Sequence, residues 1–159
     1  MPQHETPHRR ACSHTRYKLS CAEYDELMHQ ADYRCQLCHR SAGETGHGHL
    51  VVDHDFRVGD WAGRGILCST CNGKIEYTDS EDPARAAYLG NPWYRRMLAS
   101  RGLRVELAEP PLGTTVHAGR RTWRRTPNGW CSLDRYRGRA LTWAQIHRRF
   151  GPHNITLLD

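Results

Sequence analysis

The sequence predicts an α+β fold, with a core in the order strand, strand, helix, short flanking helices, and a small basic hairpin and helix at the C-terminal end. Two Cys-x2-Cys pairs enclose the two strand-like segments, so the ends of this stretch are expected to lie close together. An Asn-Gly turn between two later strand-like segments predicts the hairpin. Most of the positive charge falls in the same C-terminal part, residues 113–159.

The composition indicates a small hydrophobic core. Only 38% of the 159 residues are apolar and Phe occurs twice, and a core of this size usually requires a covalent or metal staple. The N-terminal residues contain no apolar segment of the kind that directs secretion, and no apolar run is long enough to span a membrane. We therefore expect a cytoplasmic protein without a membrane partner, in which the thiols are reduced.

The cysteine spacing predicts a zinc-stapled core. Two residues separate the cysteines in each of the pairs Cys35–Cys38 and Cys68–Cys71, and 29 residues lie between the pairs. Four thiolates from two such knuckles bind Zn²⁺ in a closed tetrahedral site that stabilises the fold. Two disulfides are the alternative, which a reducing compartment disfavours. The other cysteines have no paired spacing and are expected to be buried or unused thiols: Cys12, Cys21 and Cys131.

Local signals predict helices on both sides of the strands. Ser20 and Glu23 form the S-x-x-E pattern of a capping box, which predicts a helix to about residue 31. A proline close to the expected start predicts two more helices, at residues 83–89 and 92–100.

The segment between the cysteine pairs predicts a hairpin. Leu50–Val52 has the β-branched character of a strand, residues 56–63 contain the glycines of a connection, and Arg64–Leu67 fits the return strand. A helix is expected directly after the second cysteine pair, with Asn72 as its N-cap.

The chain is expected to consist of four parts: a flexible arm at residues 1–15, a main domain at 16–104, a linker at 105–112 and an accessory module at 113–159. The module should contain the hairpin that turns at Asn128-Gly129, followed by a helix at residues 141–150.

The accessory module is strongly basic. It holds nine Arg against two acidic residues, whereas residues 1–112 are nearly neutral. Arginines interleaved with aromatic residues fit a polyanionic partner such as nucleic acid. An Arg-rich surface that is merely solvated is the simpler alternative. The interleaved tryptophans are Trp123, Trp130 and Trp143.

Three polar residues at the ends of the predicted hairpin suit phosphodiester hydrolysis. Asp53 and Asn72 offer the hard oxygen ligands that Mg²⁺ or Mn²⁺ prefers. His54 suits a general base, because imidazole titrates near physiological pH. Each residue also has a simpler explanation: Asp53 as a turn residue, His54 as a solvated side chain and Asn72 as a helix cap. Their shared spacing relative to the cysteines favours the catalytic interpretation.

These residues carry a family resemblance. The runs YKLSCAEYDELMHQADYRCQLC, VVDHDF and GRGILCSTCNGK resemble the HNH nucleases of the phage recombination endonuclease VII family. The resemblance implies a ββα-metal (HNH, His-Me finger) fold with a four-cysteine zinc, and cleavage of branched DNA such as Holliday junctions. It implies that His54 is the general base, that Asp53 and Asn72 hold a catalytic Mg²⁺ or Mn²⁺, and that Arg64 contacts phosphate.

The sequence departs from the family pattern at three positions. Phe56 stands where many relatives have a second histidine of an Asp-His-Asp-His motif. Val51 and Ile75 replace a histidine and a glutamate of the junction-cutting prototype, and His49 and Glu76 are the nearby candidates to stand in for them. These departures bear on junction specificity more than on nuclease chemistry.

The resulting expectation is a metal-dependent HNH endonuclease that hydrolyses DNA phosphodiester bonds in branched or nicked DNA. Cleavage of two strands would favour a homodimer. A non-catalytic zinc-ribbon DNA-binding protein is the alternative, and a protein-interaction module is a third one.

Overall fold

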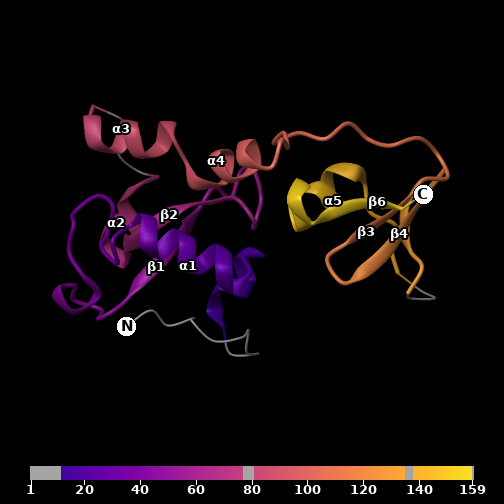
Figure 1. Cartoon of the computed structure of the whole chain (residues 1–159). Coiled ribbons are helices and arrows are strands. Elements are labelled where there is room, and N and C mark those ends of the chain that lie inside the picture. The colour runs from indigo at the N-terminus through magenta and orange to yellow at the C-terminus, as the bar shows by residue number, and fades with distance from the viewer. Residues whose placement is uncertain (1–11, 77–80, 135–137, 159) are drawn as a thin grey trace.

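The computed structural model describes residues 12–76, 81–134 and 138–158. It has a mixed α+β fold, in agreement with the expected class (Figure 1). The N-terminal part contains η1 (Ser13–Tyr17), α1 (Cys21–Gln30), η2 (Ala42–Glu44), β1 (Leu50–His54), β2 (Gly63–Cys68), α2 (Ser69–Lys74), α3 (Pro83–Gly90) and α4 (Trp93–Ser100). The C-terminal part contains β3 (Thr115–Ala118), β4 (Arg121–Thr126), β5 (Gly129–Ser132), α5 (Trp143–Phe150), η3 (Pro152–Asn154) and β6 (Ile155–Leu158).

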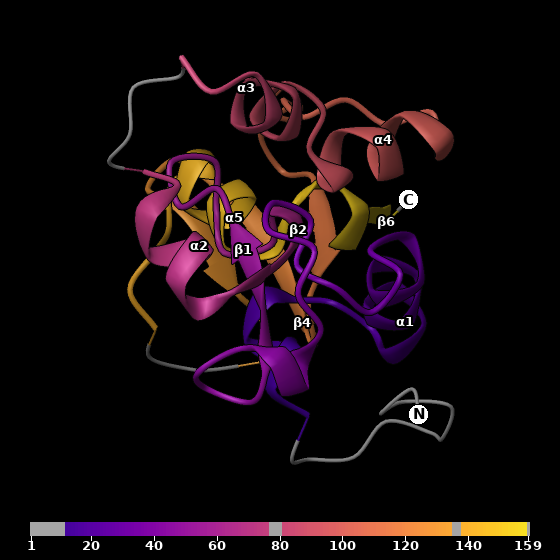
Figure 2. The ribbon, with the colours of Figure 1, turned by 90° about the vertical axis from the view of Figure 1, so that its left-hand side faces the viewer.

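The centre of the N-terminal part is an antiparallel hairpin of β1 and β2, followed directly by α2. The register pairs Leu50 with Cys68 and Asp53 with Gly65, and it shifts between Asp53 and His54. Both strands lie where the sequence predicted them. Helices α1 and α2 lie on different sides of the hairpin, with α3 and α4 along one edge (Figures 1 and 2).

Helix α1 begins with the predicted capping box. The Ser20 hydroxyl accepts the Glu23 N–H, and the Glu23 carboxylate accepts the Ser20 N–H at 2.8 Å. Leu27 and Ala31 are buried against the hairpin core. Glu23 also accepts a hydrogen bond from Arg101 at 2.7 Å, which ties α1 to the end of α4.

Helices α3 and α4 also follow the prediction. Asp82 caps α3 through the Ala84 N–H at 3.0 Å, with Pro83 in the first turn. The buried side of α4 packs onto the hairpin core through four residues: Trp93, Tyr94, Met97 and Leu98.

The C-terminal part is a four-stranded antiparallel sheet in the order β5-β4-β3-β6, packed against α5. The β4–β5 hairpin and α5 form as predicted, except that the hairpin loop is Pro127-Asn128 and Gly129 begins β5. The Thr142 side chain caps α5. Strands β3 and β6 were not expected. Each strand has only four residues, and the two lie at opposite ends of the module's sequence. Their pairing therefore has no local sequence signal.

The tryptophans of this part form its core. Trp123 and Trp130 are buried, and the half-buried Trp143 packs on Trp130 at a tilt of 35° with ring centroids 5.0 Å apart. Trp123 and Trp130 therefore serve the core of this part. The predicted linker packs onto the same core, since the Trp143 indole N–H donates to the Leu107 carbonyl at 2.8 Å.

The two parts of the chain contact each other at Trp61. The rings of His147 and His153 lie 5.9 and 5.6 Å from the Trp61 ring. Arg148, on α5, donates to the Phe56 carbonyl at 3.0 Å. Helix α5 and the η3 turn that follows it are the elements of the C-terminal part that make these contacts (Figure 1).

The predicted flexible arm is only partly described. Residues 1–11 lie outside the described residues, but Cys12 and His14 are buried and residues 13–17 form η1. The prediction of a flexible arm is therefore wrong for residues 12–15. Among the described residues, no helix is long and apolar enough to cross a membrane.

Candidate metal and active site

The four paired cysteines converge on one point. The sulfur atoms of Cys35, Cys38, Cys68 and Cys71 all lie within 4.8 Å of one another. Cys35 and Cys68 are buried, Cys71 is half-buried and Cys38 is exposed. One compact cluster of four thiols is the donor set of a single tetrahedral zinc site rather than of two separate disulfides. The cluster can hold a structural zinc ion.

Backbone pairing explains how two distant knuckles meet. Gln36, inside the first knuckle, donates its N–H to the Ile66 carbonyl at 3.1 Å, and its side-chain oxygen accepts the Ile66 N–H at 2.8 Å. The second knuckle follows β2 directly. Cys68 caps α2, since its sulfur accepts the Cys71 N–H at 3.4 Å.

The thiols differ in acidity. Burial raises the pKa of Cys35, but backbone N–H groups of Cys38, Cys68 and Leu37 outweigh it and lower this pKa to about 7. Burial and the neighbouring cysteines raise the pKa of Cys71. A thiolate at Cys35 therefore forms readily, whereas Cys71 needs a nearby cation to lose its proton.

Asp53, at the end of β1, lies in a dense hydrogen-bond network. Arg64 donates to its carboxylate from Nε at 2.8 Å and from Nη2 at 2.9 Å. The Tyr88 hydroxyl donates to the same carboxylate at 2.9 Å. Asp53 is only 3% exposed and Arg64 8%. The carboxylate is thereby fixed in one orientation.

Arg64 also contacts Glu76, which accepts a hydrogen bond from Nη2. Burial alone would lower the pKa of Arg64, but Asp53 and Glu76 raise it, so the guanidinium stays charged. The hydrogen bonds among the described residues use Nε and Nη2, which leaves Nη1 for the predicted phosphate contact. Glu76, a candidate replacement for the family glutamate, belongs to this network.

Tyr88 and Gly65 complete the surroundings of Asp53. Burial, followed by the charge of Asp53, raises the pKa of the Tyr88 hydroxyl, so it remains a donor. A Cβ at Gly65 would lie 2.1 Å from the Gln36 side-chain oxygen and 2.9 Å from the Tyr88 ring. Glycine at this position lets the first zinc knuckle and α3 approach β2.

His54 is the last residue of β1 and directly follows Asp53 in the chain. Its ring is half-buried and packs against the ring of Tyr17 at 5.0 Å and 50°. The irregularity in the ladder between Asp53 and His54 changes the alternation of side chains at this point.

Asn72 does not cap a helix, contrary to the prediction. Helix α2 begins at Ser69 with Cys68 as its N-cap, so Asn72 lies inside the helix. Its side-chain oxygen is buried and has no hydrogen-bond partner among the described residues. A buried, unpaired amide oxygen is costly, so such an atom usually indicates a ligand or water.

The oxygens of Asp53 and Asn72 fit a divalent cation in their chemistry. A carboxylate offers about four lone-pair directions, and the three bonds from Arg64 and Tyr88 leave one on Oδ1. The unpaired Asn72 oxygen supplies a second hard donor. Hard oxygens of this kind suit Mg²⁺ or Mn²⁺.

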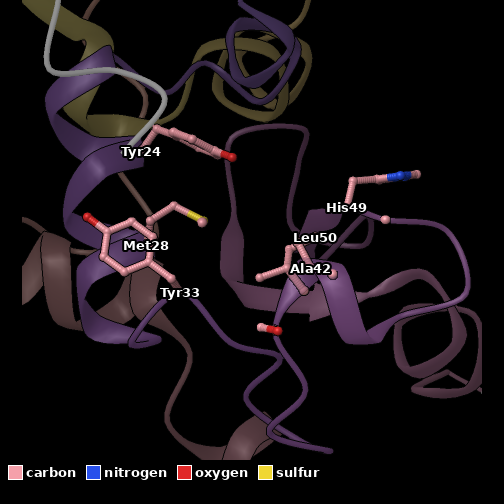
Figure 3. Close-up of a pocket in the computed structure, with 9 residues that line it drawn as sticks. Tyr24, Met28, Tyr33, Ala42, His49 and Leu50 are labelled. Atoms are coloured by element: carbon pink, nitrogen blue, oxygen red, sulfur yellow. The ribbon is translucent and has the colours of Figure 1, made fainter. Parts of the chain in front are cut away.

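Phe56 and His49, the other positions that bear on the family pattern, have surroundings different from those of Asp53. Phe56 is 49% exposed, in the loop held by Arg148. His49 lines one side of a surface pocket of about 310 Å³, and α1 forms the opposite side (Figure 3). The pocket wall includes Tyr24, Met28, Tyr33, Ala42 and Leu50.

Two contacts of the site, one made by Tyr88 and one by Tyr17, were not predicted from the sequence. Tyr88 lies 35 residues after Asp53, on a helix that was predicted only for its proline start. Tyr17 precedes His54 by more than 30 residues and contacts it through η1. Neither has a local motif, and both contacts depend on how distant elements pack.

The fold is that of a mixed α+β protein with a four-cysteine cluster that can hold zinc and a polar site at the end of its hairpin. Comparison with family models matches residues 10–91, just over half of the chain, to recombination endonuclease VII. The chain therefore belongs to the recombination endonuclease VII family. Membership identifies a family of nucleases and implies DNA as the partner. Comparisons with curated proteins and with solved structures gave no match.

Proposed function

We propose that the protein is a metal-dependent HNH endonuclease that hydrolyses DNA phosphodiester bonds. The observation that carries the proposal is the buried Asn72 oxygen, which has no hydrogen-bond partner among the described residues and lies on α2, the helix that contains Cys71. In this proposal β1, β2 and α2 form a ββα-metal unit. The four-cysteine zinc holds α2 in place against the hairpin.

Asp53 and Asn72 would hold Mg²⁺ or Mn²⁺ through their side-chain oxygens. When bound, the ion stabilises the negative charge that develops on the phosphate. Arg64 and Tyr88 hold the Asp53 carboxylate in one orientation through their hydrogen bonds. Arg64 Nη1 is the part of this guanidinium that would contact a phosphate oxygen.

His54 would act as the general base and accept a proton from the attacking water. Its position at the strand end, beside Asp53, suits this role. The Tyr17 ring restricts the orientation of the imidazole. A ring held in one orientation gives proton transfer at a fixed geometry.

The C-terminal part would bind the DNA backbone. Several of its arginines are exposed on β4, on α5 and in the connections: Arg120, Arg124, Arg139, Arg148 and Arg149. Such contacts position a duplex without reading its sequence. Branched or nicked DNA is the proposed substrate, and a homodimer the proposed form for cutting two strands.

Cleavage of supercoiled plasmid and of a synthetic four-way junction tests the proposal. We expect cutting with Mg²⁺ or Mn²⁺, none with EDTA, and loss of cutting in His54→Ala with zinc content and DNA binding intact. The matched control is His29→Ala, an exposed histidine on α1, which should cut normally. Retained cleavage in His54→Ala would exclude His54 as the base.

A non-catalytic zinc-ribbon DNA-binding protein is the second candidate. It is favoured by the burial of Asp53 and its pairing with Arg64, an arrangement that a structural ion pair also adopts. This candidate predicts DNA binding without cleavage under every metal condition of the same assay.

A further inference from the structure

A second group of metal-ligating side chains lies outside the four-cysteine cluster. Donor atoms of Cys12, His14 and Cys21 all lie within 4.8 Å of one another. Cys12 precedes η1, His14 lies within it and Cys21 is the first residue of α1. Cys12 and His14 are buried, and Cys21 is half-buried. No local motif marks this group, because its spacing is irregular.

The imidazole of His14 is oriented as in a metal ligand. Its Nδ1 lies 2.9 Å from the Leu19 carbonyl, an acceptor, so Nδ1 carries the proton. Nε2 therefore presents its lone pair, and it lies 3.7 Å from the Cys21 sulfur. The Tyr24 ring stacks on the imidazole at 5.0 Å and 19° and fixes its plane. A backbone carbonyl that orients a ligand histidine is a usual outer-shell partner in metal sites.

The spacing of the donors fits zinc. With Zn–S near 2.3 Å and Zn–N near 2.0 Å, ligand atoms of a tetrahedral site lie about 3.5–3.8 Å apart. The separation of 3.7 Å between His14 Nε2 and Cys21 Sγ lies in this range. Two thiolates and an imidazole favour Zn²⁺ over Mg²⁺.

We propose that Cys12, His14 and Cys21 bind a second zinc ion, with water completing the coordination. The inference does not rest on the proposed nuclease function. It would join η1 to the start of α1. Because η1 ends at Tyr17, the ion would also fix the ring that packs on His54.

The metal content of the full-length chain tests this proposal. Zinc is measured by elemental analysis on protein purified under reducing conditions. We expect two zinc ions per chain in the wild type and one in Cys21→Ser. This variant replaces a half-buried side chain at a helix start, where serine is well tolerated. The matched control is Cys131→Ser, a half-buried cysteine of β5, which should keep two ions.

A second measurement reports on the thiolate ligands themselves. When Co²⁺ replaces zinc, the thiolate-to-metal charge-transfer absorption of Cys21→Ser should be weaker than that of the wild type, by the contribution of one metal site. One zinc per chain in the wild type would overturn the proposal, as would a Cys12–Cys21 disulfide in the zinc-containing protein. Zinc content is independent of cleavage, so either proposal can fail alone.

Discussion

Arg64 and Asp53 form a buried, two-bond ion pair across the β1–β2 hairpin. Their side chains are 8% and 4% exposed, and the shortest N–O distance is 2.8 Å. The pair joins β1, which ends at His54, to β2, which ends at Cys68 of the second cysteine pair. The geometry of the candidate site and the stability of the hairpin therefore depend on the same contact.

Replacement of Arg64 should destabilise the protein and abolish cleavage. Arg64→Ala leaves the Asp53 carboxylate buried without its counter-ion, which costs about 3–5 kcal/mol. Denaturant unfolding measures this loss. Tyr88→Phe removes a single hydrogen bond from the same carboxylate and should cost about 1–2 kcal/mol. Equal losses in the two variants would contradict the leading role of Arg64.

The exposed arginines of the C-terminal part should contribute to DNA affinity through phosphate contacts. Arg124→Gln and Arg149→Gln should each weaken binding and lower the salt slope by about 1. These substitutions are preferable to deletion of residues 113–159, which would uncover Trp61. Arg104→Gln, an exposed arginine before the module, is the control. An unchanged salt slope in both variants would contradict a role of the C-terminal part in DNA binding.

Elements with local signals were predictable from the sequence. The Ser20 capping box and the two Cys-x2-Cys pairs each act over a few residues, and each lies where it was expected. The predicted hairpin also forms, although its turn lies at Pro127-Asn128, one residue before the expected Asn128-Gly129. Contacts that depend on packing were not predictable. Tyr88 reaches Asp53 from a helix 35 residues away, and no periodicity encodes that approach.

Asn72 shows why the start of a helix was misplaced. Asparagine favours the N-cap in general, but here the Cys68 sulfur accepts the Cys71 N–H and begins α2 earlier. The geometry of a zinc knuckle thus takes precedence over the capping preference. Because α2 begins before Asn72, a role as helix cap no longer explains this residue.

Loss of a cysteine of the four-thiol cluster should unfold the N-terminal part. In Cys71→Ser the zinc loses a ligand, and the binding free energy of a structural zinc contributes directly to folding. Chelation of the wild type should have the same effect. Circular dichroism and thermal unfolding measure it, with Cys131→Ser as the control. A chelated protein that unfolds at an unchanged temperature would exclude a structural zinc.

Mild acid should weaken the contact between the two parts of the chain. Burial lowers the pKa of His147 below its ordinary value of 6.5, although the Val105 carbonyl and the charge of Glu106 oppose this. Burial lowers the pKa of His153 likewise, with Glu23 raising it and Arg101 lowering it.

The sign of the pH effect follows from these shifts. Below pH 6.5 the unfolded chain binds protons that the folded histidines do not, so stability falls as pH falls toward their folded values. The melting temperature should therefore decrease between pH 7.5 and pH 5.5. His147→Gln should reduce this decrease, whereas His29→Gln should not. An equally steep decrease in His147→Gln and His153→Gln would assign the effect to other groups.

Asn72→Ala separates catalysis from stability. The Asn72 oxygen is buried without a hydrogen-bond partner among the described residues, so its removal relieves a desolvation cost instead of breaking a bond. Without added Mg²⁺ the variant should be as stable as the wild type or slightly more stable. A ligand that binds only the folded state raises the melting temperature, so millimolar Mg²⁺ should stabilise the wild type but not Asn72→Ala, which should also lose cleavage. A variant that still gains stability from Mg²⁺ and cuts DNA would show that this oxygen is not a metal ligand.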